Sequence, residues 1–160
     1  MQLTLLHNFH KGGREMDASE LVEVAKSKGF RPYFDEATEE FAALSAKLGR
    51  CYRGTVASTP GNDLYAHAVE IDMRDCVVVI MLRFDLRIYA LVAYRKIGRA
   101  LSAVCVGEPL REKLRQALQI LQVSGFQEIT QKVGSVCLGR EPLERGMMSN
   151  TVFAFFFEDG

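Results

Sequence analysis

The sequence predicts an α+β fold in which an antiparallel sheet of about five to seven strands is flanked by three helices. Apolar residues recur at helical spacing in three segments, at 17–28, 35–48 and 109–124. Between the second and third segments the period of the pattern changes from 3.6 to 2, which is typical of strands joined by tight turns. The chain has 160 residues, the size of one domain, so we expect a single domain over residues 1–160.

The N-terminal part is expected to start with a strand over residues 2–9, QLTLLHNF, followed by a loop and the first helix. Asp17 or Ser19 would cap this helix, whose first turn is acidic and whose last turn contains lysines. Gly29 would end it. Asp35 is the expected cap of the second helix, and the glutamates near its N-terminal end suit the helix dipole without any catalytic role.

A meander of five antiparallel strands is predicted over residues 51–106. Its segments are CYRGTVA, LYAHAVEID, CVVVIMLRF, LRIYALVAYR and RALSAVCVG, separated by turn sequences such as STPGND. The third is almost wholly apolar, which indicates that both of its faces are covered. Residues 86–104 could instead form one amphipathic helix, but their β-branched and aromatic residues favour strands.

The C-terminal part begins with the third helix, which opens at Glu108 and Pro109. The segment FQEITQKVGSVCLG is then expected to return to the sheet as one or two short strands. TVFAFFFE is predicted to be a final strand with Phe153, Phe155 and Phe157 on one side. Because a strand this apolar must be covered or paired with another chain, these three phenylalanines are candidate interface residues.

The composition excludes several classes of protein. The 20 basic and 20 acidic side chains cancel, so the chain has no general attraction to nucleic acid or to anionic membranes. No apolar run is long enough to span a membrane, and the N-terminus lacks the features of a signal peptide. The four cysteines follow neither a zinc-ribbon nor a thioredoxin pattern. We therefore expect a cytoplasmic protein with reduced thiols, no metal and no cofactor.

The stretch HNFHKGG, residues 7–13, most resembles a chemical site. His7 and His10 are three residues apart, which would place them on one face of a helix but on opposite faces of a strand. The glycines lack the spacing of known phosphate-binding loops. His67 is the third weak catalytic candidate, although a histidine at the edge of the core is the simpler interpretation. Motifs of serine hydrolases and zinc proteases are missing from the sequence, so it favours a role other than catalysis.

Basic residues outnumber acidic ones between residues 83 and 115. The candidate ligand- or anion-binding residues in this region are Arg83, Arg87, Arg95 and Arg99. A solvated surface, or ion pairs with the acidic N-terminal helices, is the competing interpretation.

The sequence therefore favours a small, soluble, non-catalytic binding or regulatory module that acts through a protein partner or as a homodimer. One alternative is a small enzyme or ligand-binding domain with a pocket between the sheet and the N-terminal helices. A second alternative is an RNA or anion binder that uses the basic region at 83–115.

Overall fold

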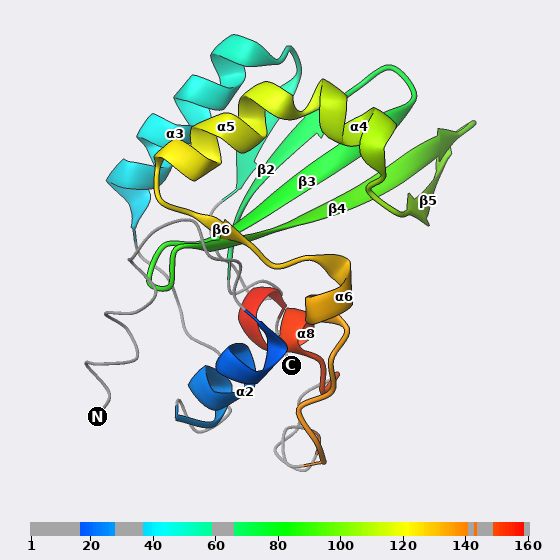
Figure 1. Ribbon diagram of the computed structural model, residues 1–160. Helices are drawn as coiled ribbons and strands as arrows, with labels where there is room; N and C mark the ends of the chain where they lie inside the picture. The colour runs from blue at the N-terminus through cyan, green and yellow to red at the C-terminus, as the bar shows by residue number, and fades with distance from the viewer. Residues whose placement is uncertain (1–16, 28–36, 59–65, 141–142, 144–148, 159–160) are drawn as a thin grey trace.

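The computed structural model describes residues 17–27, 37–58, 66–140, 143 and 149–158. The fold is α+β, as predicted, with an open sheet of six strands and helices on both of its faces (Figure 1). The strand expected over residues 2–9, and with it His7 and His10, lies outside the described residues.

Five strands follow one another across the sheet in chain order and confirm the predicted antiparallel meander. They are β1 (Thr55–Ser58), β2 (His67–Asp72), β3 (Cys76–Arg83), β4 (Ile88–Ile97) and β5 (Ala100–Val104). The helical alternative for residues 86–104 is wrong, because β4 and β5 form a hairpin whose turn contains Gly98 at φ 59°. The predicted first strand of the meander was too long: the preceding helix continues to Cys51 and β1 starts only at Thr55.

Two sets of helices flank the sheet, and the second set lies against one end of its face (Figure 1). One face is covered by α3 (Thr38–Cys51), α4 (Glu108–Lys113) and α5 (Arg115–Val123). The other face is covered by α2 (Ala18–Ser27), α6 (Gln131–Gly134) and α8 (Val152–Phe157). Because alternate strand residues point to opposite faces, the sheet divides the core into two apolar clusters, one under each set.

The start of the first helix agrees with the prediction, whereas the end of the second helix does not. Asp17 caps α2 as predicted: its carboxylate accepts a hydrogen bond from the Glu20 N–H at 2.9 Å, and the Glu20 carboxylate accepts from the Asp17 N–H at 3.4 Å. The helix predicted over residues 35–48 ends later than predicted, since α3 runs through Gly49 to Cys51.

The segment 126–139 contains less sheet than predicted. It forms only the two-residue strand β6 (Gln127–Glu128), which pairs in parallel with the first residues of β4, before the chain turns into α6. A single bridge between Cys137 and Thr151 then connects this segment with the start of α8.

The predicted final strand is wrong, because residues 152–157 form the helix α8. Five of its six residues are buried, so the helix is enclosed on nearly all sides. A short segment that is apolar at every position has neither the period of a strand nor that of a helix, and the sequence pattern therefore could not separate the two. The polar residue that marks this helix is its N-cap, Thr151, whose hydroxyl accepts a hydrogen bond from the Ala154 N–H at 3.2 Å.

Replacing Thr151 with alanine should lower the free energy of unfolding by about 1 kcal/mol, the usual loss when a helix N-cap is removed. Thr151→Ser keeps the hydroxyl and should retain most of the stability. Urea unfolding of both variants measures the difference. Equal stability of the two variants would contradict a capped helix at this position.

Candidate functional site

One edge of the strand β4 pairs with two different strands along its length. Residues 93–97 pair with β5 in antiparallel register, whereas residues 88–89 pair with β6 in parallel register. Between these two stretches β5 and β6 diverge from β4, and a groove of about 550 Å³ opens at this fork. That volume lies within the range of roughly 300–1,000 Å³ that is usual for ligand sites.

The main chain of Leu91 faces this groove. On the same side of β4, the Arg87 carbonyl accepts from the Gln127 N–H at 2.8 Å. Two residues further along, the Tyr89 carbonyl accepts from the Ile129 N–H at 2.7 Å. Main-chain groups of a strand alternate between its two edges, so the N–H and C=O of Leu91 point to this side as well. Within the described ranges, neither β5 nor β6 pairs with Leu91.

The amide of Leu91 should therefore exchange with solvent at least about 100-fold faster than that of Val92, although the two are neighbours in one strand. Val92 pairs with Val79 of β3, on the edge of β4 that faces away from the groove. Hydrogen exchange followed by NMR compares the two amides directly. Equal protection of both would mean that the Leu91 N–H already has a partner.

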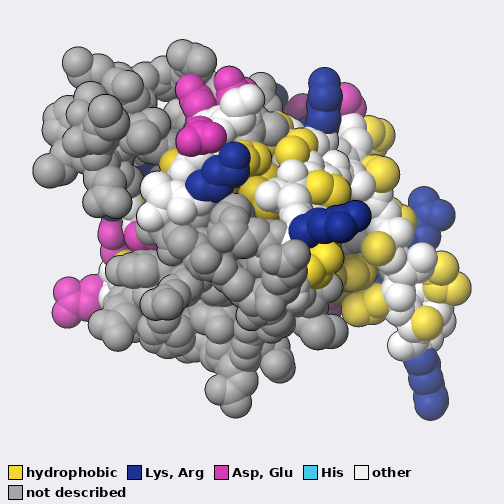
Figure 2. All heavy atoms as spheres, turned by 90° about the horizontal axis from the view of Figure 1, so that it is seen from below, with side chains coloured by type: hydrophobic (Ala, Val, Ile, Leu, Met, Phe, Trp, Pro, Cys, Tyr) yellow, Lys and Arg dark blue, Asp and Glu magenta, His cyan; other side chains and the backbone are white. Residues whose placement is uncertain are grey.

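The walls of the groove are mostly apolar, and several of their side chains are small. These small residues are Ala90, Ala93, Ala103, Gly134 and Ser135. The groove is therefore wide enough for side chains of another molecule to enter it. Seen from below, hydrophobic side chains and Lys or Arg side chains lie next to one another on the described part of the surface (Figure 2).

A polar network lies at one end of the groove. The Arg111 guanidinium donates to both carboxylate oxygens of Glu128. Its Nη2 lies 2.6 Å and its Nη1 lies 3.1 Å from Glu128 Oε2, and Nη2 also donates to Oε1. The Tyr89 hydroxyl is hydrogen-bonded to the same carboxylate. Burial raises the pKa of Tyr89, and the negative charge of Glu128 raises it further, so the hydroxyl keeps its proton at neutral pH. Lys132 adds an exposed positive charge to the lining.

The predicted catalytic residue His67 lies in the core rather than at a surface. It is fully buried, and its ring centroid lies 4.5 Å from that of Phe41 and 5.2 Å from that of Phe84. Its strand partner is Leu82, so the next residue, Arg83, points to the opposite face of the sheet. His67 and Arg83 thus do not converge on one site.

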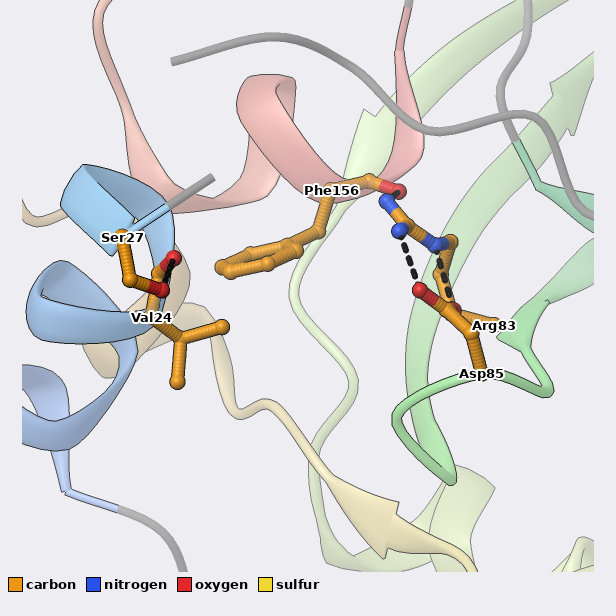
Figure 3. A network of polar contacts seen from close by, with 5 residues as sticks. All are labelled: Val24, Ser27, Arg83, Asp85 and Phe156. Carbon is orange, nitrogen blue, oxygen red and sulfur yellow. Dashed lines mark hydrogen bonds and ion pairs between the residues drawn. The ribbon is translucent and has the colours of Figure 1, made fainter. Parts of the chain in front are cut away.

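Arg83 is also fully buried, and its partners belong to the protein itself. Its guanidinium donates to the Asp85 carboxylate at 2.9 and 2.7 Å and to the Phe156 carbonyl at 3.1 Å. Figure 3 shows this carbonyl directed at Arg83, while the ring of Phe156 extends toward Val24 of α2. Arg83 thereby connects the end of β3 with α8.

The other predicted anion-binding residues do not form one surface with Arg83. Arg87 forms an ion pair with Glu40 of α3, and its guanidinium lies 5.2 Å from the centroid of the Phe126 ring. Arg95 and Arg99 are exposed on the β4–β5 hairpin. Two of the four arginines thus serve internal contacts and two remain at the surface.

The predicted interface residues are also separated. Phe155 and Phe157 are fully buried between α8 and the sheet, so they offer no surface to a partner in this structure. Phe153 is only partly buried and lines the groove. The use of these residues as an interface stays a prediction, now without the apolar strand from which it was inferred.

The groove at the fork was not predicted from the sequence. The alternative hypothesis of a small enzyme or ligand-binding domain placed a pocket between the sheet and the N-terminal helices, whereas no residue of α2 or α3 is among the described residues that line this groove. Arg111 and Glu128 are 17 positions apart in the chain and have no recognisable motif. The small residues of β4 and β5 were the available signal, because alanines in strands leave space on a sheet surface.

The fold and the groove define an α+β protein with a ligand-sized groove at an interrupted sheet edge. Comparison with models of protein families, with curated proteins and with solved structures finds no match. In the described ranges, no three His, Cys, Asp or Glu side chains are grouped so that they could hold a metal ion. No helix in the same part of the chain combines the length and apolarity needed to cross a membrane.

Proposed function

We propose that this protein is a non-catalytic binding module whose groove accepts an extended segment of a protein partner. The observation that carries the proposal is the main chain of Leu91, whose N–H and C=O face the groove between the parts of β4 that pair with β5 and β6. An extended peptide satisfies such groups by adding a short strand, and its alternate side chains then enter the pockets on either side. The small residues of the walls supply that space.

The chemistry of the lining favours binding over catalysis. Neither histidine nor cysteine is among the described residues that line the groove. Glu128 supplies the one carboxylate among the described lining residues, and Arg111 and Tyr89 hold it. In this part of the lining, the hydroxyls of Thr130, Ser135 and Thr151 therefore have no histidine or uncommitted carboxylate that would activate them as nucleophiles.

The thiols support a cytoplasmic setting for this function. All four cysteines are free, and three of them are exposed, namely Cys51, Cys105 and Cys137. Exposed free thiols persist in reducing compartments and tend to oxidise outside them.

Selection of random phage-displayed peptides on the immobilised protein tests the proposal. Extended peptides with apolar residues at alternate positions should be enriched, and their binding should slow exchange of the Leu91 amide. A peptide that binds without protecting Leu91 would contradict addition to β4. Selection that enriches no peptide, with a monomer at all concentrations in light scattering, would also contradict the proposal.

A variant with a blocked groove makes this test specific. Ala103 of β5 lines the groove and is exposed, so Ala103→Trp should fill the groove without disturbing the core. We expect this variant to bind the selected peptides at least about tenfold more weakly, the loss typical of a blocked interface centre. Ala100→Trp is the matched control, because Ala100 is exposed on the same strand but is not part of the lining. Equal binding by both variants would place the peptide elsewhere.

A homodimer is the second candidate, and the strand β5 favours it. In the described part of the chain β5 pairs only with β4, and Leu101 on β5 and Ile97 on β4 are each 57% exposed. An apolar edge strand of this kind can pair with a second copy of itself. Analytical ultracentrifugation over a wide concentration range separates this candidate from a monomer that binds a different partner.

A further inference from the structure

The helix predicted over residues 109–124 is broken. The structure divides it into α4 and α5 at Leu114, which has φ −90° and ψ 3°. The hydrogen bonds from the Leu114 N–H to the Leu110 carbonyl, at 3.0 Å, and from the Leu118 N–H to the Leu114 carbonyl, at 2.9 Å, are present on either side of the break. In an unbroken helix, the Ala117 N–H would donate to the Lys113 carbonyl.

The hydroxyl of Tyr52 occupies the position of that missing bond. It donates to the Lys113 carbonyl at 3.1 Å and accepts from the Ala117 N–H at 3.2 Å. Insertion of a side chain or a water molecule into the hydrogen bonds of a helix is a known cause of sharp kinks. Tyr52 directly follows the last residue of α3, so the end of this helix contacts the junction between α4 and α5.

Figure 1 shows α4 and α5 running in different directions, and this bend matters because Arg111 of α4 lines the groove. None of the residues of α4 is buried, so packing alone holds this six-residue helix weakly. Two polar contacts hold α4 in place. The Tyr52 hydroxyl donates to the Lys113 carbonyl, and the Arg111 guanidinium donates to the Glu128 carboxylate at the end of the groove.

We propose that Tyr52 is a positioning residue of the groove: its hydroxyl keeps α4 and α5 bent, and this bend brings Arg111 to Glu128. The significance for binding rests on the proposed function, whereas the effect on the helix does not. Loss of the hydroxyl frees the Lys113 carbonyl and the Ala117 N–H to bond with each other, which straightens the helix and moves Arg111 away from Glu128.

NMR of Tyr52→Phe tests the effect on the helix. In the wild-type protein, residual dipolar couplings of residues 108–113 and 115–123 should fit two helix axes, and in the variant they should fit one. The Cα signal of Leu114 should move downfield into the helical range. Tyr94→Phe is the matched control, because Tyr94 lies on β4 and the described residues offer its hydroxyl no hydrogen bond. Two unchanged helix axes in Tyr52→Phe would overturn the proposal.

A second variant separates Tyr52 from the other contact of α4. Arg111→Gln removes the ion pair with Glu128 but leaves the hydroxyl of Tyr52 in the helix. If Tyr52 imposes the bend, this variant keeps two helix axes and an unchanged Leu114 signal. If Arg111→Gln straightens the helix, the ion pair imposes the bend and the proposal is overturned. This variant also keeps the proposal open to refutation if Tyr52→Phe does not fold.

Binding of the peptide selected by phage display then tests the consequence for the groove. Tyr52→Phe should bind it at least about fivefold more weakly than wild type, and Tyr94→Phe should bind it within about twofold. A straightened helix with unchanged affinity would overturn the role of Tyr52 in positioning the groove. Failure of the wild-type protein to bind any peptide would overturn the proposed function instead, and the helix axes would still decide what Tyr52 does.

Discussion

Replacement of Arg83 with methionine is expected to lower the free energy of unfolding by about 3–5 kcal/mol, the range found when one partner of a buried ion pair is removed. The guanidinium is fully buried and makes a bidentate contact with Asp85. Without it, the Asp85 side chain, which is only 16% exposed, loses this positive partner. The Phe156 carbonyl also loses its hydrogen bond from Arg83, which is a polar contact between the end of β3 and α8.

Denaturant unfolding of Arg83→Met measures this loss, with Arg95→Met as the matched control. Arg95 is exposed on β4, and its replacement should change the free energy of unfolding by less than about 0.5 kcal/mol. A double-mutant cycle with Asp85→Asn then isolates the energy of the pair. Equal effects of the two arginine variants would show that Arg83 does not stabilise the fold through these contacts.

The second large effect is expected for Phe155→Ala, which should also cost about 3–5 kcal/mol. Phe155 is fully buried on α8, and its ring meets that of Phe156 at 4.8 Å between centroids and at nearly a right angle. It belongs to the apolar cluster that joins α8 to α2 and the sheet. Removal of the ring leaves a cavity that the short helix cannot fill without losing its other contacts.

Calorimetric or denaturant unfolding of Phe155→Ala checks this expectation. Val123→Ala is the control, because Val123 is 82% exposed and its replacement should change stability by less than about 0.5 kcal/mol. A loss below about 1 kcal/mol for Phe155→Ala would mean that α8 does not form part of the core.

Local patterns were sufficient for most of the sheet and for the first helix. The alternation of apolar residues predicted the meander, since one residue of slippage would move each strand's apolar set to the wrong face. Asp17 identified the start of α2, because its side chain bonds to a main-chain group only three residues away. Such signals act within a few residues and can therefore be read along the chain.

The errors fall where the spacing of apolar residues does not record the contacts that accompany the local structure. The helical periodicity of residues 109–124 predicts one helix, but the structure has a break there, where the hydroxyl of Tyr52, 65 positions from Ala117, is hydrogen-bonded to the main chain. Likewise, α8 is a helix rather than a strand because the core encloses it and Thr151 caps it, and its uniform run of apolar residues carries no period.

By itself, the sequence determined the α+β class, the antiparallel meander and the approximate positions of the main helices, because these depend on the spacing of apolar residues and on local caps. Only the tertiary structure decided where a site can form. The groove exists because β5 and β6 approach β4 from opposite ends and leave Leu91 between them, and the pairing of Arg111 with Glu128 closes one end. Contacts of this kind join segments whose separation along the chain contains no periodic signal.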